Sequence, residues 1–233
     1  MKALLYKEFK LAFHPICYVF TLAFPLMVLI PKFPLAIGFI YILTCYPVIF
    51  LGANKGQQSN DLLYSTLLPI RKKDIVLARI MVVAIMQFVY MGLMAALMPL
   101  GGLINQNLPV DPGMNPAEAI NIPGIERSGT VNLLALGIIG FALADLIFFP
   151  IYYKNGKSIV MSTLFTIFGF VFYIAIFTII LVYIPGFEWY KNFMNNSDLW
   201  IQFIFFACAL LFYIGIHFLV YRISSKRLEK VDF

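Results

Sequence analysis

The sequence predicts an all-α integral membrane protein with six transmembrane helices, an N-terminal interfacial helix and a short cytoplasmic helix between spans 2 and 3. Hydrophobic residues make up 62% and charged residues 12% of the 233 positions, which is about half the charge of a soluble domain. A spanning helix needs about 20 apolar residues, and six apolar windows reach that length. A single transmembrane domain, residues 1–233, therefore holds spans at approximately 13–31, 34–53, 75–103, 131–152, 158–185 and 199–221.

The basic residues gather on one side of these windows. Of the 17 Lys and Arg residues, only Lys32, Arg127 and Lys191 flank the windows on the other side. Because cytoplasmic loops carry the excess of Lys and Arg, both chain ends are expected in the cytoplasm. The basic residues are scattered over several cytoplasmic segments, so the net charge of +6 reflects membrane topology and gives no support to nucleic-acid binding.

The first 12 residues predict a helix that lies in the cytoplasmic interface. Its apolar face consists of Met1, Leu4, Leu5, Phe9 and Ala12, at helical spacing. Lys7 and Lys10 are expected on the opposite side, toward lipid headgroups. Glu8 falls near the middle of the apolar stripe, where an unpaired carboxylate is costly. Two alternatives are open for it: a cationic partner, or a side chain tilted to water at a frayed helix end.

The segment between spans 2 and 3 predicts a second short helix. Asn60 and Asp61 are good N-caps, and Pro69 stops the helix. Its apolar residues are Leu62, Leu63, Leu67 and Leu68. A helix of about two turns has little stability alone, so it needs the membrane or a partner protein to pack on. The next residues are Arg71, Lys72, Lys73 and Asp74, of which Asp74 is expected to cap the third span.

Asp145 is the only acidic residue within a predicted span. An intramembrane carboxylate costs about 2.5 to 3.5 kcal/mol on insertion scales unless it is paired or hydrated. Asp145 is therefore either a proton or substrate site, or a hydrogen-bonding group that ties helices together near the cytoplasmic interface. Its position five residues before Pro150, near the basic end of the span, favours the second interpretation. Its partner is expected to come from another helix.

Other residues of the spans give weaker signals. Gly137 and Gly140, like Gly92 and Ala96 in the preceding span, permit close helix contact. The three cysteines, Cys17, Cys45 and Cys208, share no metal-like spacing with the two histidines, so they are expected to be small buried hydrophobes and no metal site is predicted. The outer connection, residues 105–129, is longer than ordinary loops and is expected to be either functional or disordered.

Enzyme motifs are missing from the chain. Gly156, Lys157 and Ser158 resemble the end of a phosphate-binding loop, but Ile151 occupies the position of its leading glycine. The sequence contains no zinc-protease pattern and no nucleophile elbow. We therefore expect no enzymatic activity and no cofactor in this chain.

Two stretches resemble the type 2 ABC transporter permease family, in particular the membrane subunits of small bacterial ABC exporters. The first is LPIRKKDIVLAR, from Leu68 to Arg79, and the second is PIYYKNG, from Pro150 to Gly156. In that family the first motif follows a short cytoplasmic helix and the second closes the fourth span. The matching residues of the second motif are Pro150, Tyr152, Tyr153, Lys154 and Gly156, whereas Asn155 departs from the apolar or aromatic residue usual before the glycine. An acidic residue in the interfacial helix, here Glu8, is also usual.

The resemblance implies a permease subunit of an ATP-driven exporter in the bacterial cytoplasmic membrane. Such subunits pair into homodimers or heterodimers and dock on a separate ABC ATP-binding subunit, which holds the ATP and Mg, through the coupling helix at residues 60–68. Leu62, Leu63, Leu67 and Leu68 are then the apolar anchor, with polar or lipid contacts from Arg71, Lys72 and Lys73. We also expect Glu8 to pair with one of these three cations. Because the spans hold almost no fixed charge, the expected substrate is hydrophobic or amphipathic: a peptide, a lipid or an antibiotic.

The alternative is a six-helix secondary carrier, or the substrate-binding membrane subunit of an uptake system. Such a protein needs a polar cluster in the middle of the membrane. Asp145 and Gln87 are the main candidates. A third class, a membrane-embedded enzyme, needs convergent acid, base or nucleophile groups, and the sequence does not provide them.

Overall fold

A computed structural model describes residues 2–12, 15–26, 29, 70–107, 131–155, 159–183 and 198–230. Within these ranges the chain forms six α-helices and one π-helical turn, with no strand. The second predicted span, the coupling helix and most of the outer connection lie outside the described residues. The count of six spans and the coupling helix therefore stay predictions.

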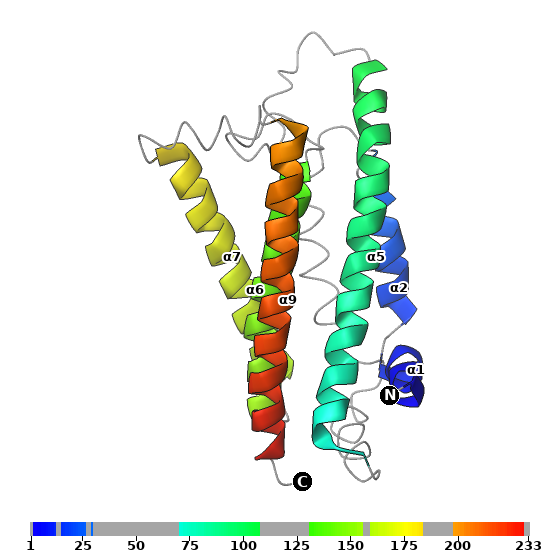
Figure 1. Ribbon diagram of the computed structural model, residues 1–233, viewed down its shortest axis with the longest axis vertical. Helices are drawn as coiled ribbons and strands as arrows, with labels where there is room; N and C mark the ends of the chain where they lie inside the picture. Colours follow the sequence, from blue (N-terminus) through cyan, green and yellow to red (C-terminus); the bar gives the residue numbers. More distant parts are fainter. Residues whose placement is uncertain are drawn as a thin grey trace.

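The four long helices alternate in direction, and the helix at residues 15–26 runs in the same direction as the first of them (Figure 1). Helix α1 (Lys2–Lys7) continues into the π-helical turn η1 (Glu8–Ala12), and α2 (Pro15–Leu26) follows. The long helices are α5 (Lys72–Asn107), α6 (Val131–Asn155), α7 (Ile159–Tyr183) and α9 (Leu199–Glu229). Both chain ends lie at the same end of the molecule (Figure 1).

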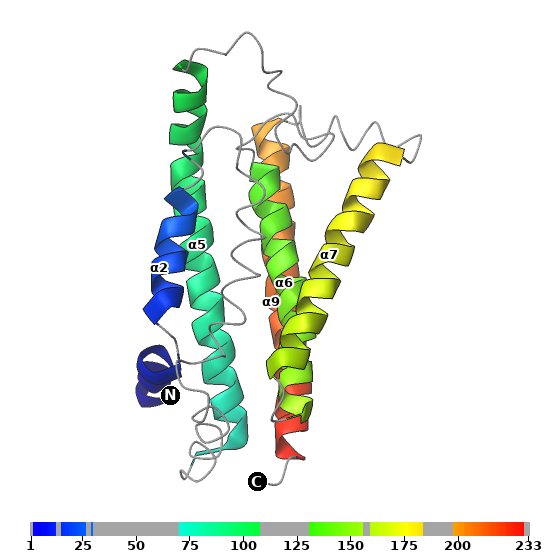
Figure 2. The same cartoon turned by 180° about the vertical axis from the view of Figure 1, so that it is seen from behind.

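Among the described residues, three helices are long and apolar enough to cross a membrane. The qualifying stretches within the described residues are Lys72–Leu97, Leu134–Lys154 and Leu199–Glu229. The stretch Met161–Tyr173 in α7 is a shorter apolar helix. Helices α6 and α9 pack along their length, α2 packs on α5, and α7 leans away from α9 toward its C-terminal end (Figure 2).

Several helix ends differ from the predicted span limits. Helix α5 begins at Lys72, so Asp74 is not its N-cap residue but lies in its first turn, where a carboxylate is favourable to the helix dipole. Helix α6 continues through Pro150 to Asn155, and Nη1 of Arg227 in α9 donates to the Pro150 carbonyl at 2.5 Å. Helix α9 extends to Glu229. Hydropathy measures the thickness of the apolar layer, whereas a helix can continue into the polar interface beyond it.

The core lies between α5, α6 and α9 and is rich in aromatic residues. Its largest fully buried side chains are Tyr90, Tyr153, Phe141, Phe148, Phe149, Ile75 and Ile138. The rings of Tyr90 and Phe141 join α5 to α6 in an edge-to-face contact, with centroids 5.9 Å apart. This geometry is favourable for aromatic pairs.

Glycines lie at close contacts in two helix pairs, α6 with α7 and α5 with α6. A Cβ atom at Gly140 would lie 2.9 Å from Cε2 of Phe170 in α7, and one at Gly137 would lie 3.2 Å from Cε of Met91 in α5. Gly169 of α7, which the sequence did not single out, leaves no room for a Cβ beside Ile147 of α6. The expected contact at Gly92 is not found among the described residues, where a Cβ there would have nothing within 4 Å.

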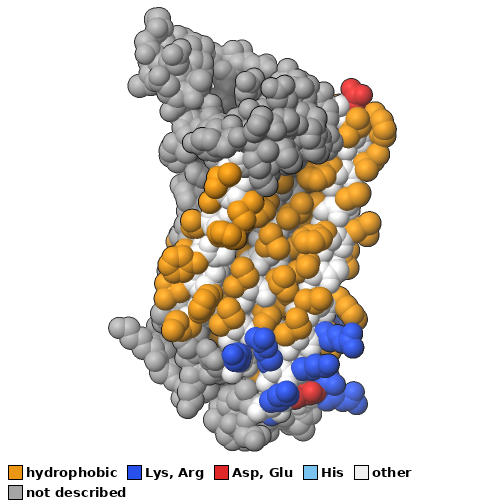
Figure 3. Space-filling view, turned by 90° about the vertical axis from the view of Figure 1, so that its left-hand side faces the viewer, with side chains coloured by type: hydrophobic (Ala, Val, Ile, Leu, Met, Phe, Trp, Pro, Cys, Tyr) orange, Lys and Arg blue, Asp and Glu red, His pale blue; other side chains and the backbone are white. Residues whose placement is uncertain are grey.

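The outer surface is divided into an apolar belt and a basic end. Figure 3 shows hydrophobic side chains over the middle of the molecule and Lys and Arg side chains gathered at one end. Exposed belt residues include Phe168 and Phe172 of α7 and Leu211 and Phe218 of α9. Cys208 is also exposed on α9, so its expected burial is wrong. This distribution matches a protein whose belt faces lipid.

Candidate functional site

The interfacial helix lies across the N-terminal ends of α2 and α5 (Figure 1). Leu4 and Glu8 are buried, whereas Lys2, Tyr6 and Lys10 are exposed. The hydroxyl of Tyr18 in α2 donates to the Phe9 carbonyl at 2.6 Å, which fixes the turn between the two helices. The segment from Glu8 is π-helical, and such turns occur frequently at functional sites.

Glu8 forms a buried ion pair with Arg79 of α5. Nε of Arg79 donates to Oε2 at 2.9 Å, and Nη2 donates to Oε1 at 3.5 Å. The Glu8 side chain is 1% exposed and the Arg79 side chain 8%. Nζ of Lys7 lies 4.0 Å from the same carboxylate. A carboxylate held by two guanidinium nitrogens is fixed in direction as well as in charge.

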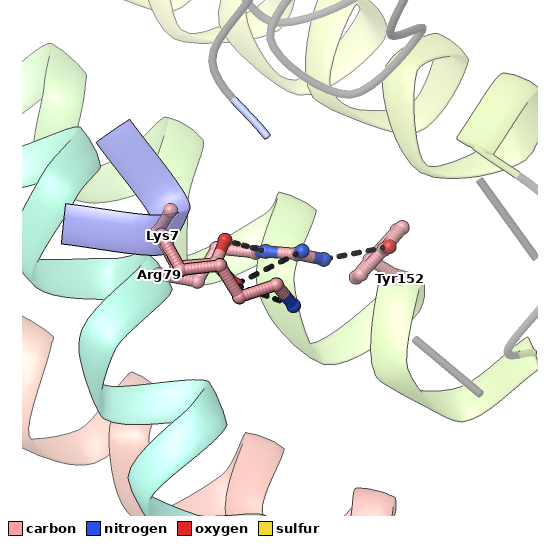
Figure 4. A network of polar contacts seen from close by, with 4 residues as sticks. Lys7, Arg79 and Tyr152 are labelled. Carbon is pink, nitrogen blue, oxygen red and sulfur yellow. Dashed lines mark hydrogen bonds and ion pairs between the residues drawn. The ribbon is translucent and has the colours of Figure 1, made fainter. Parts of the chain in front are cut away.

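The same guanidinium also reaches the fourth predicted span. Nη1 of Arg79 donates to the hydroxyl of Tyr152 in α6 at 3.1 Å, and the Tyr152 ring is stacked against Phe148, with centroids 5.9 Å apart. Figure 4 shows Arg79 between the interfacial helix and Tyr152. Arg79 closes the first of the two motifs noted in the sequence and Tyr152 lies in the second, so the network brings both motifs together at Glu8.

Of the two alternatives for Glu8, the cationic partner is confirmed, but the partner that we expected is wrong. Arg71 is exposed and Lys72 begins α5, while Nζ of Lys73 lies 3.3 Å from Glu229 of α9. Arg79 takes their place because it lies two helical turns further along α5, at the level of the interfacial helix.

The two lysines of the interfacial helix have different surroundings. Lys7 is half-buried beside Glu8 and does not face away from the apolar side as expected. Lys10 is exposed, and its Nζ lies 5.6 Å from the centroid of the Tyr6 ring.

The remaining predicted site residues are divided between described and undescribed parts of the chain. Tyr153 is buried and its ring is stacked on Phe149, with centroids 6.4 Å apart, while Lys154 is exposed. The coupling-helix residues lie outside the described residues, as does Gly156. They are Asn60, Asp61, Leu62, Leu63, Leu67, Leu68 and Pro69.

A second polar cluster surrounds Asp145 between α5, α6 and α9. Asp145 is fully buried, and its Oδ2 accepts a hydrogen bond from Nε2 of Gln87 at 3.0 Å. The hydroxyl of Tyr213 donates to Oε1 of Gln87 at 2.5 Å. Nε2 of His217 lies 3.0 Å from Oδ2 of Asp145, as a close polar contact without the alignment of a hydrogen bond. Nδ1 of His217 lies 3.0 Å from the Tyr213 carbonyl.

The position of this cluster differs from the predicted one. Asp145 lies ten residues before the end of α6 at Asn155, which is about 15 Å along the helix axis, so it lies deeper within the span than predicted. The expectation that its partners come from other helices is confirmed. Tyr213 and His217 were missed as partners, although a histidine within an apolar span is a signal for a polar site.

Neither cluster is arranged as a metal centre. Within the described ranges, no group of three or more His, Cys, Asp and Glu side chains is placed to hold a metal ion. Both clusters link helices: the first joins the interfacial helix to α5 and α6, and the second joins α5, α6 and α9.

Comparison with known families identifies the family of the chain. A family model described as ABC-2 family transporter protein matches residues 3–227, a range that includes both polar clusters. A search of curated proteins and a search of solved structures each found no match. Permeases of this family are multi-pass membrane subunits that work with an ABC ATP-binding subunit. The chain therefore belongs to the ABC-2 family of transporter proteins.

Proposed function

We propose that this permease is one half of an ATP-driven exporter that works with a second permease subunit and a separate ATP-binding subunit. The observation that carries the proposal is the buried network of Glu8, Arg79 and Tyr152. It joins the interfacial helix to the ends of α5 and α6 that lie on the basic, cytoplasmic side. A cytoplasmic ATPase would act on this side of the membrane.

The network suggests how a movement of the ATP-binding subunit would reach the spans. The coupling helix expected at residues 60–68 directly precedes α5, so its displacement would be passed to Lys72 at the start of that helix. Arg79 lies seven residues further, about 10 Å along the axis, and links α5 to Glu8 and Tyr152. The three elements would then move as one body. Rocking of two such halves against each other gives alternating access to a central path.

The character of the spans supports a hydrophobic or amphipathic substrate. Within the described spans Asp145 is the one carboxylate in the apolar interior, and Gln87 and His217 already contact it. A hydrated ion finds few groups here that replace its water shell, whereas peptides, lipids and hydrophobic antibiotics match the apolar surfaces. Export as the direction follows from the resemblance of the two motifs to exporters. ATP and Mg would bind to the partner subunit.

The test is co-purification with the candidate ATP-binding subunit, a neighbouring reading frame with a phosphate-binding loop. Wild type is compared with the variant L63E/L67E, which places two carboxylates on the apolar face of the coupling helix. Ser65→Glu, which adds one carboxylate to a polar position of the same segment, is the control. We expect the double variant to lose association and permease-dependent ATP hydrolysis while the control retains both. Failure of wild type to associate with the ATP-binding subunit would overturn the proposal.

The secondary carrier is a second candidate, and the Asp145 cluster is the observation that favours it. Carriers place polar groups near the middle of the membrane, and four such side chains meet here from three helices. Transport by the purified chain in liposomes without any ATP-binding subunit, abolished by Asp145→Asn, would establish the carrier. Transport that requires ATP and the partner subunit would exclude it.

A further inference from the structure

The last turns of α9 carry three exposed cations on one face. Arg222, Lys226 and Lys230 are each exposed and are spaced four residues apart, so they lie within one sector of the helix. We call these three residues the α9 basic stripe. Side chains of like charge at this spacing repel one another, so the stripe is stabilised by a negative counter-charge.

The described part of the chain does not supply that counter-charge. The nearby acid, Glu229, is paired with Lys73 of α5 at 3.3 Å. The neighbouring cation, Arg227, is directed inward and donates to the Pro150 carbonyl. Among the described residues, no hydrogen bond or ion pair reaches the side chains of the α9 basic stripe. Its charges are therefore available to a ligand.

The stripe continues the face of α9 that lies in the apolar belt. Leu211 is 70% exposed and Phe218 is 67% exposed, and both fall in the same helical sector as Arg222. Figure 3 shows the hydrophobic belt giving way to Lys and Arg side chains at this end. A surface that changes from exposed apolar to exposed cationic residues along one helix face crosses the boundary between lipid tails and headgroups.

The distances along the helix match the headgroup layer. Arg222 follows Phe218 by four residues, about 6 Å, and Lys226 follows by another 6 Å. The polar layer of one leaflet is about 5 to 8 Å thick. Arg222 therefore lies within this layer, and the long side chain of Lys226 extends back toward its phosphate groups. Lys230, about 6 Å further along, lies on the aqueous side of the layer, within the distance over which anionic headgroups attract a cation.

We propose that Arg222, Lys226 and Lys230 form a binding site for the phosphate headgroup of an anionic phospholipid in the cytoplasmic leaflet. Guanidinium and ammonium groups are the preferred partners of phosphate oxygens, and cationic residues beside a spanning helix attract anionic lipids. Lipid is favoured over a protein partner because the stripe is continuous with the apolar belt on the same helix face. The inference does not depend on the transport direction or on the substrate.

The test uses the purified full-length chain in detergent, with phosphatidylglycerol and phosphatidylcholine of identical acyl chains as probes. Bound lipid is measured by native mass spectrometry. Wild type is compared with R222Q/K226Q/K230Q and with the charge-preserving control R222K/K226R/K230R. We expect wild type and control to bind phosphatidylglycerol in preference to phosphatidylcholine. The neutralised variant should lose affinity by about fivefold for each charge removed.

Two further measurements keep the test decisive. Thermal unfolding shows whether the neutralised variant is folded. If the variant is unfolded, the single variant Lys226→Gln is used in its place. The salt dependence of wild-type binding is then measured as well, because electrostatic binding weakens with ionic strength. Equal binding of both lipids by wild type, or unchanged phosphatidylglycerol binding by a folded neutralised variant, would overturn the proposal. Unchanged lipid binding together with lost association with the ATP-binding subunit would instead assign the stripe to protein docking.

Discussion

Glu8 and Arg79 are 71 residues apart in the sequence, yet Nε of Arg79 donates to Oε2 of Glu8 at 2.9 Å in a buried ion pair. Removing two charges from water is expensive, and their attraction offsets that cost only when the geometry is good. The two guanidinium contacts to one carboxylate meet this condition. The interfacial helix is thereby fixed to α5 by more than its apolar face.

Glu8→Gln is expected to destabilise the folded chain by about 3 kcal/mol, because it leaves the buried guanidinium of Arg79 without an opposite charge. The double variant E8Q/R79Q should recover part of this loss, which gives a coupling energy of about 1 to 3 kcal/mol in a double-mutant cycle. Unfolding in detergent measures the stability. Lys10→Gln, an exposed position in the same segment, serves as the control and should change stability by less than about 0.5 kcal/mol. Additive effects of the two changes would show that the pair contributes no coupling.

Tyr152→Phe separates the hydrogen bond from the packing of the same ring. The ring stacked on Phe148 is retained, while the acceptor of the 3.1 Å bond from Arg79 is removed. A hydrogen bond to a charged group contributes about 1.5 kcal/mol or more, so stability should fall by about that amount. Permease-dependent ATP hydrolysis should fall as well, if the network transmits motion.

The matched control for this change is Tyr6→Phe, because the Tyr6 hydroxyl is exposed and has only a long contact with Lys10 at 3.4 Å. Unfolding temperature and ATP hydrolysis of the reconstituted complex are measured for both variants. Equal unfolding temperatures and equal ATP hydrolysis of the two variants would show that the Tyr152 hydroxyl makes no contribution to the network.

Gly140→Ala tests the contact between α6 and α7. The added Cβ would lie 2.9 Å from the Phe170 ring, closer than real Cβ contacts allow, so the helices must separate at a cost of about 1 to 3 kcal/mol. Gly215→Ala in α9 is the control, since a Cβ there has nothing within 4 Å and alanine favours the helix by up to about 1 kcal/mol. Unfolding in detergent should move in opposite directions for the two variants. Similar stability of both would contradict the close approach at Gly140.

The all-helical character and the need of Glu8 for a cation followed from the sequence, because each depends on local properties. An apolar run of sufficient length must be helical in a membrane, where each backbone polar group needs a partner within its own segment. A carboxylate in the middle of an apolar stripe needs a partner by the same argument. Neither inference requires knowledge of how distant helices are aligned.

The residues that pair with Glu8 and Asp145 could not be predicted, because they depend on how distant helices are aligned. Helical periodicity shows which face a residue occupies, but not which residues of another helix lie at the same depth. The packing of the interfacial helix on α5 places Glu8 beside Arg79, about two helical turns beyond the cations at the start of that helix. Likewise, His217 and Tyr213 reach Asp145 only because α6 and α9 pack antiparallel in one register.

Substitutions of Asp145 test whether its cluster is structural or binds substrate. Asp145→Leu removes the acceptor of Gln87 and the contact of His217 and leaves both polar groups buried, so we expect a loss of about 3 kcal/mol in unfolding stability. Asp145→Asn keeps the shape and an oxygen acceptor, so its cost should be about 1 kcal/mol. Asp198→Asn is the control, because Asp198 is exposed and makes no side-chain cap of α9.

The decisive comparison is between stability and transport in Asp145→Asn. If the cluster only joins α5, α6 and α9, transport and ATP hydrolysis should fall together and only as far as the loss of folded protein explains. An Asn variant that is folded, hydrolyses ATP with its partner and no longer moves substrate would contradict this expectation. Asp145 would then act on the transported molecule or on a proton, because the carboxylate differs from the amide in charge while its size is nearly the same.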